Sequence, residues 1–125
     1  MLYKILLSCF EDLVVNEKKV AFYVQTPRDA VSPYVEVHIL EAIEGTFAES
    51  SLVKAKLRAV SRYTGDQEIE TLVQQLRQKL EGNSFISERA VACAKIQCCT
   101  RKVLNDGVTR TADLEVHFML RKVAN

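Results

Sequence analysis

Four cysteines and two histidines are the side chains of this 125-residue sequence best suited to metal binding or nucleophilic chemistry. The cysteines stand at positions 9, 93, 98 and 99, and no pair has the short fixed spacing of a zinc site. On an extended strand, Cys98 and Cys99 would point to opposite faces and could not share one metal ion. His38 and His117 lie in different segments among charged residues. We therefore expect free structural thiols, solvated or interface histidines, and no metal site.

Short catalytic and cofactor-binding motifs are absent from the sequence. It contains no glycine-rich phosphate loop, zinc-protease helix motif, calcium-binding loop or serine nucleophile motif, and its glycines are scattered at positions 45, 65, 82 and 107. Acid pairs such as Glu11 and Asp12 fall on predicted helix surfaces, where a solvated charge is the simplest interpretation. The sequence predicts no catalytic residue and no cofactor.

A row of cations between positions 54 and 62 is the sharpest local feature. Strand alternation places on one face the side chains of Lys54, Lys56, Arg58 and Arg62, with about 7 Å between residues two positions apart. The simpler interpretation is a solvent-facing strand; the functional one is a contact surface for an acidic protein face or for phosphates. A loop at 25–32 and a hairpin tip at 105–107 are further candidate contacts. The candidate interface residues are Lys54, Lys56, Arg58, Arg62, Arg28 and Asp106.

Charge and hydropathy restrict the class of protein. The formal net charge of +1 excludes a whole-protein basic field for nucleic acid or an anionic membrane. Residues 1–53 contain 4 basic and 8 acidic side chains, whereas residues 54–125 contain 13 and 8, an asymmetry that suits self-association through complementary faces. The apolar runs fall far short of the roughly 20 residues that span a bilayer, and the first residues do not match a signal peptide. We expect one domain, residues 1–125, in a reducing cytosol.

Hydrophobic periodicity in the first half of the chain predicts one helix and three strands. Residues 2–14 have apolar side chains at helical spacing, and 20–24 is a short apolar run. Residues 33–43 and 51–63 alternate as strands. In the first of these two strands the alternation places on one face Val35, Val37, Ile39 and Ile43. In the second it places on one face Val53, Ala55, Leu57, Ala59 and Tyr63.

The second half of the chain predicts a capped helix followed by a hairpin. Thr64 and Gln67 have capping-box spacing at the start of a helix over 64–81, whose buried stripe is Ile69, Leu72, Val73, Leu76 and Leu80. The turn Asn105-Asp106-Gly107 joins strands over 89–104 and 108–122. The order is α-β-β-β-α-β-β. We expect an α+β domain, an antiparallel sheet with two helices packed on one face.

Taken together, these segments resemble the tail-terminator, or tail-completion, family of long-tailed bacteriophages and phage-like gene transfer agents. The resemblance covers most of the chain. It lies in the N-terminal helix, the run Ser32-Pro33-Tyr34-Val35-Glu36-Val37, the strand Ala55 to Val60 continuing into Thr64 to Leu72, the helix end Leu76 to Gly82, and the closing strand Arg110 to Arg121. In this family an aromatic residue often ends the third strand and another ends the last; Tyr63 fits the first position, and Arg121 to Asn125 contain no aromatic.

The resemblance implies a structural virion protein rather than an enzyme. Members of that family form rings, typically of six copies, that cap the tail tube, end tail growth and contact the head connector. DNA passes through the lumen of the ring without sequence-specific binding. Such a protein, from a phage, prophage or gene transfer agent, would assemble in the bacterial cytoplasm and end at the head-proximal end of the tail. Two alternatives stay open: a small oligomeric enzyme or ligand-binding domain with a site between subunits, and a nucleic-acid-binding regulator that uses the basic row.

Overall fold

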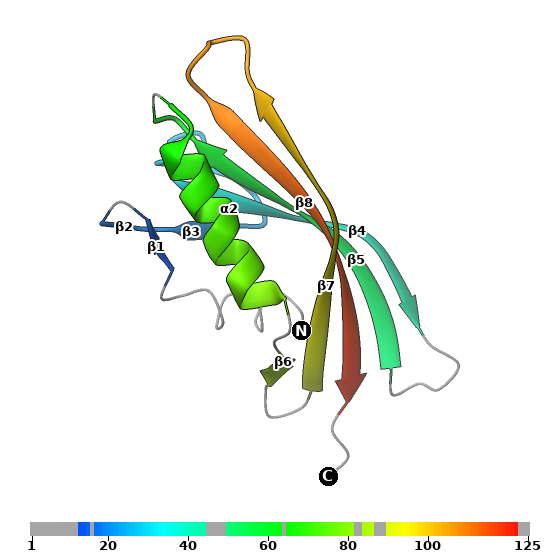
Figure 1. Ribbon diagram of the computed structural model, residues 1–125. Coiled ribbons are helices and arrows are strands. Elements are labelled where there is room, and N and C mark those ends of the chain that lie inside the picture. The colour runs from blue at the N-terminus through cyan, green and yellow to red at the C-terminus, as the bar shows by residue number, and fades with distance from the viewer. Residues whose placement is uncertain are drawn as a thin grey trace.

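The computed structural model has an α+β fold, and its described residues form a two-stranded sheet, a six-stranded sheet and one helix. It describes residues 13–15, 17–44, 50–63, 65–81, 84–86 and 90–122. The elements are β1 (Val14–Val15), β2 (Lys18–Lys19), β3 (Ala21–Tyr23), β4 (Tyr34–Glu44), β5 (Ser50–Ser61), α2 (Gln67–Leu80), β6 (Ser84–Ile86), β7 (Ala90–Val103) and β8 (Arg110–Lys122). Six strands form a twisted sheet in the order β3-β4-β5-β8-β7-β6, and α2 covers one face of it (Figure 1).

The sheet is mixed, which corrects the expectation of a purely antiparallel one. β3 pairs in parallel with the start of β4, through Ala21–Tyr23 and Tyr34–Glu36, while the other neighbouring strands are antiparallel. The loop between Tyr23 and Tyr34 brings the chain back to the level of β3, so both strands run in the same direction. Apolar periodicity locates β3 correctly, but it contains no information on strand direction.

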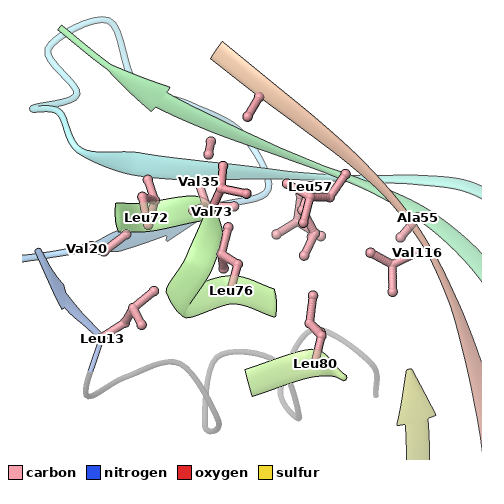
Figure 2. Packing of buried hydrophobic residues seen from close by; sticks show 14 of the residues in the cluster. Leu13, Val20, Val35, Ala55, Leu57, Leu72, Val73, Leu76, Leu80 and Val116 are labelled. Atoms are coloured by element: carbon pink, nitrogen blue, oxygen red, sulfur yellow. The ribbon is translucent and has the colours of Figure 1, made fainter. Parts of the chain in front are cut away.

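The core lies between α2 and the strand residues that face it. All five residues of the predicted apolar stripe of α2 are buried, as are the alternating residues Val53, Ala55, Leu57 and Ala59 of β5 and Ala112, Leu114, Val116 and Phe118 of β8. Figure 2 shows Leu72, Val73 and Leu76 between the helix and the strands that carry Val35 and Leu57. The apolar periods therefore predict this part of the core correctly.

The start of α2 differs from the predicted capping box. Thr64 lies outside the described residues, and the N-cap is Asp66, whose side chain makes no capping hydrogen bond. Its carboxylate instead accepts a hydrogen bond from Nε of Arg110 at 2.7 Å. The competing ion pair with β8 explains why the residue at the cap position does not cap the helix with its side chain.

The N-terminal helix predicted over 2–14 is not confirmed. Residues 1–12 lie outside the described part of the chain, and the two residues that fall within it, at 13 and 14, are not helical. Val14 and Val15 form β1, which pairs with β2 through a turn in which Glu17 has a positive φ of 65°. β-Branched residues favour extended backbone, so the valine pair fits a strand. Leu13, Val15 and Val20 are buried in the same cluster as α2.

Two β-bulges change the alternation that the sequence predicted. The register of β4 with β5 shifts between Ile39 and Glu41. The partner of buried Val53 is therefore Ala42 and not Ile43, which the sequence placed on the apolar face of this strand. The register of β7 with β8 shifts between Ile96 and Cys98. The sequence predicts strict alternation over 89–104, with one apolar face made of Ala90, Ala92, Ala94, Ile96 and Cys98. After the bulge, however, Cys99 packs against the core and Cys98 is exposed, which corrects the prediction for Cys98.

The predicted hairpin between β7 and β8 is confirmed, and its tip is held by local hydrogen bonds. Asp106 accepts hydrogen bonds from the backbone nitrogens of Val108 and Thr109, at 2.9 and 2.8 Å, and from the Thr109 hydroxyl. Gly107 has a φ of +72°, a backbone conformation that favours glycine.

Within the described residues, no helix has the length and apolar character needed to cross a membrane.

Candidate functional site

The candidate functional surface is the face of the sheet opposite α2. Strand alternation sends every second residue of β4, β5, β8 and β7 away from the helix. Most of these side chains are half-buried or exposed, whereas Tyr34, Val60 and Thr111 are buried. We call this surface the open face. Its polar residues are Glu36, His38, Glu41, Lys54, Lys56, Arg58, Lys95, Cys98, Thr100, Lys102, Asp113, Glu115 and His117.

On the open face the predicted row of cations lies between acidic side chains of β4 and β8. Arg58 forms a two-point ion pair with Asp113, with Nε–Oδ1 and Nη2–Oδ2 distances of 2.8 and 3.2 Å. Lys54 Nζ lies 3.4 Å from Glu41 Oε2. Lys56 is paired in register with Glu115 of β8. The structure therefore brings Lys54, Lys56 and Arg58 together, as predicted, but each beside an acid that the sequence-based analysis did not associate with it.

The Arg58–Asp113 pair lowers the pKa of the Asp113 carboxyl. The main cause is the hydrogen bond from Arg58, and the charges of Arg58, Lys56 and His38 act in the same direction, whereas partial burial acts against them. Because the pKa is lower in the folded chain, the stabilisation by this carboxylate is present above its ordinary pKa of 3.8. It is lost as the pH falls through the lower pKa of the folded state.

Replacing Arg58 with glutamine should raise the pKa of Asp113 back towards its ordinary value of 3.8. The physical reason is loss of the guanidinium donor and its charge. The measurement is a carboxyl-carbon NMR titration of wild type, Arg58→Gln and a control, Arg77→Gln, which removes a cation on α2 that pairs with Glu81. An Asp113 pKa that is unchanged by Arg58→Gln, or moved equally by Arg77→Gln, would contradict the assignment.

A hollow of about 420 Å³ lies on the open face beside the hairpin tip. Its charged lining residues are Glu36, Arg58, Arg62, Lys102, Asp106 and Asp113. Each carboxylate already accepts a hydrogen bond: Glu36 from Thr26, Asp113 from Arg58 and Asp106 from Thr109. Because cations and carboxylates are balanced and the acids are engaged, the hollow has the character of a polar contact surface rather than of an acid–base site.

The other predicted interface residues occupy the margin of the open face. Arg62 follows β5; its Nη1 donates to the backbone oxygen of Ala30 at 3.3 Å, and its Cζ lies 6.0 Å from the centre of the Tyr34 ring. Asp106 lines the same hollow as Arg58 and Arg62, so three of the predicted residues meet there. Arg28 is exposed in the loop before β4 and does not line this hollow.

In the part of the chain that the structure describes, the histidines and cysteines do not come together as a reactive group. β5 lies between the strands that carry His38 and His117, and His117 Nε2 is 3.9 Å from Glu115. His38 Nε2 is enclosed without a hydrogen-bond partner among the described residues. Cys98 and Cys99 have free thiols, and Cys98 Sγ lies 3.7 Å from Glu115. Within the described residues, no three His, Cys, Asp or Glu side chains gather as metal ligands.

Sequence-based analysis missed several residues of the open face. Lys95 and Lys102 are exposed on β7, and Glu36, Glu41, Asp113 and Glu115 flank the cationic row. Their alternation is visible in the sequence for β8, but assigning them to this face requires the order of strands.

A scan against protein-family models and a search of curated proteins find no match to this chain. Its function is therefore argued from the surface and from the residue patterns given above.

Proposed function

We propose that the protein is a non-enzymatic structural component of a phage-type tail. In this proposal six copies form a ring on the completed tail tube, end its growth and present a surface to the head connector. The protein assembles in the bacterial cytoplasm and remains at the head-proximal end of the virion tail. The proposal agrees with the tail-terminator resemblance of the sequence, and one feature of the structure supports it.

That feature is a long sheet with one face packed under α2 and the other face rich in charges of both signs, some of which form ion pairs. Such an open face has basic and acidic groups interleaved across β4, β5 and β8, as in the Arg58–Asp113 and Lys54–Glu41 pairs. A surface on which the charges neutralise one another attracts phosphates weakly. It suits the wall of a lumen through which DNA passes without sequence-specific binding, and α2 then lies on the outside of the ring.

The two alternatives have less support from these contacts. A nucleic-acid-binding regulator would need the basic row to be available to phosphates, but Arg58 and Lys54 are already paired with carboxylates. An enzyme with a site between subunits would need an unengaged acid, base or nucleophile near the hollow, whose carboxylates all accept hydrogen bonds. Lining the lumen of a ring is the use of this surface that we favour.

Tail length is the measurement that tests the proposed function. Particles assembled without the protein should contain tubes of variable and excessive length, because nothing stops subunit addition at the end of the tube. Supplying the wild-type protein should restore a uniform length and a ring at the head-proximal end, visible by negative-stain microscopy. Tubes of normal, uniform length made in its absence would overturn the proposal.

A site variant can be compared with a matched control in the same assay. Arg62→Glu reverses a charge at the margin of the hollow without breaking the Arg58–Asp113 pair, and Arg77→Glu makes the same change on α2. We expect Arg62→Glu to weaken capping and Arg77→Glu to leave it intact. Both monomers should stay folded, because exposed ion pairs contribute only about 0–1 kcal/mol to stability.

A further inference from the structure

We propose that neighbouring copies of the chain join edge to edge, the free edge of β4 in one copy pairing with the free edge of β7 in the next. The sheets would then continue from copy to copy around the ring. This inference rests on the ring of the proposed function and names the surfaces that close it. It is argued from backbone pairing, strand direction and charge.

Both edges of the sheet are only partly paired within the described residues. β3 covers the outer edge of β4 only at Tyr34–Glu36, and β6 covers the outer edge of β7 only at Val91–Cys93. The segments 37–44 of β4 and 94–103 of β7 have no further strand beside them in the described part of the chain. Such edges present unpaired backbone N–H and C=O groups, which can pair with a strand of another chain.

The directions of the two strands fit a repeating arrangement. β4 is antiparallel to β5, β5 to β8 and β8 to β7, so β4 and β7 of one copy run in opposite directions. A second copy placed beside the first with the same face towards the lumen therefore brings its β4 antiparallel to the β7 of the first. This contact is heterologous, and repeating it closes a ring when the rotation from copy to copy completes a full turn.

Charge distinguishes this pairing from the other edge contacts. β4 contains Glu36, Glu41 and Glu44 and no Lys or Arg, whereas β7 contains Lys95, Arg101 and Lys102 and no Asp or Glu. Glu41 and Arg101 also form exposed ion pairs within the copy, with Lys54 and Glu70, so the sign of each edge is set by the whole strand rather than by these two residues alone. Contacts of β4 with β4, or of β7 with β7, would bring like charges together, and only the mixed contact brings opposite charges together. The two edges thus use the acidic and basic halves of the sequence in the complementary manner expected for self-association.

Edge lysines and bulges are also devices by which monomeric sheets avoid aggregation. Lys95 and the bulges at Leu40 and Gln97 could serve that purpose. If the charges served only to prevent aggregation, the same sign of charge on both edges would be sufficient. Any contact between the edges of two copies would then be repulsive. Opposite signs leave one contact attractive, and this favours a second copy of the chain as the occupant of each edge.

Two charge-reversed variants test the pairing. The first, Lys95→Glu with Lys102→Glu, makes the β7 edge acidic, and the second, Glu41→Lys with Glu44→Lys, makes the β4 edge basic. By light scattering at matched concentration, each variant alone should dissociate, with the dissociation constant of the contact raised about tenfold or more. Mixed in equal amounts, the two should reassemble, and native mass spectrometry should show equal numbers of each in the ring.

The control carries the charge change of the β7 variant but places it on α2, as Arg77→Glu with Lys79→Glu, and it should assemble like wild type. Circular dichroism melting should show every monomer folded. If wild type forms rings and the edge variants form them equally well, the edge-pairing inference is overturned while the terminator proposal stands. A wild type that stays monomeric at all concentrations also overturns the inference, and tail length then decides the proposed function separately.

Discussion

Replacing Leu76 with alanine should lower the free energy of unfolding by about 2–5 kcal/mol. Leu76 is fully buried on α2 and lies in the cluster formed with β4, β5 and β8 (Figure 2). Its truncation removes apolar contacts on the helix side of the sheet and leaves a cavity that the rigid strands cannot fill. Because small domains are stable by only about 5–15 kcal/mol, this loss should be evident in chemical denaturation.

The control for Leu76→Ala is the same truncation at an exposed position. Leu40 is 54% exposed at the bulge of β4, and Leu40→Ala should change the free energy of unfolding by about 0.5 kcal/mol or less. The two variants must be compared at one protein concentration, since self-association stabilises the folded state. Equal losses in the two variants would contradict the assignment of Leu76 to the core.

The elements that the sequence predicts best are those in which local pattern and tertiary environment agree. Along β5 and β8, every second residue is apolar and packs under α2, so the period of two identifies both strand and buried face. The stripe of α2 is equally regular. The turn at Asp106-Gly107 depends on a carboxylate that caps its own loop and on a glycine with positive φ, both of which are local properties.

The features that sequence did not predict depend on partners distant in the chain. A bulge at Leu40 or Gln97 exists only relative to the neighbouring strand, and it reverses the face of the residues that follow it. Asp66 would cap α2 by its residue type, but Arg110 of β8 engages its carboxylate. The acids that neutralise the cationic row come from β4 and β8 on either side of β5, so the open face could not be assembled from any one segment.

Replacing Ser61 with alanine should lower the free energy of unfolding by about 1.5–3 kcal/mol, the range for a hydrogen bond to a charged group. Ser61 ends β5 with no exposed surface, and its hydroxyl donates to Oε1 of Glu68 at 2.8 Å. Glu68 is only 2% exposed in the first turns of α2. A carboxylate removed from water needs such donors, so the loss should greatly exceed that of an exposed hydroxyl. Thr71→Val, which removes a hydroxyl bonded to the backbone oxygen of Gln67, is the control and should change stability by about 0.5 kcal/mol or less.

A double-mutant cycle with Glu68→Gln separates the hydrogen bond from simple loss of packing at Ser61. Glutamine keeps the shape of the side chain but accepts a weaker, neutral hydrogen bond, so Ser61→Ala should cost less in the Glu68→Gln background than in wild type. Strictly additive losses of stability would contradict the Ser61–Glu68 hydrogen bond.

The contact matters beyond stability because Ser61 is followed directly by Arg62, which packs over Tyr34 at the margin of the hollow. If the Ser61–Glu68 bond fixes the end of β5 against α2, the Ser61→Ala variant should also disorder the Arg62 side chain, and a broadened Arg62 Nε–H resonance would report it.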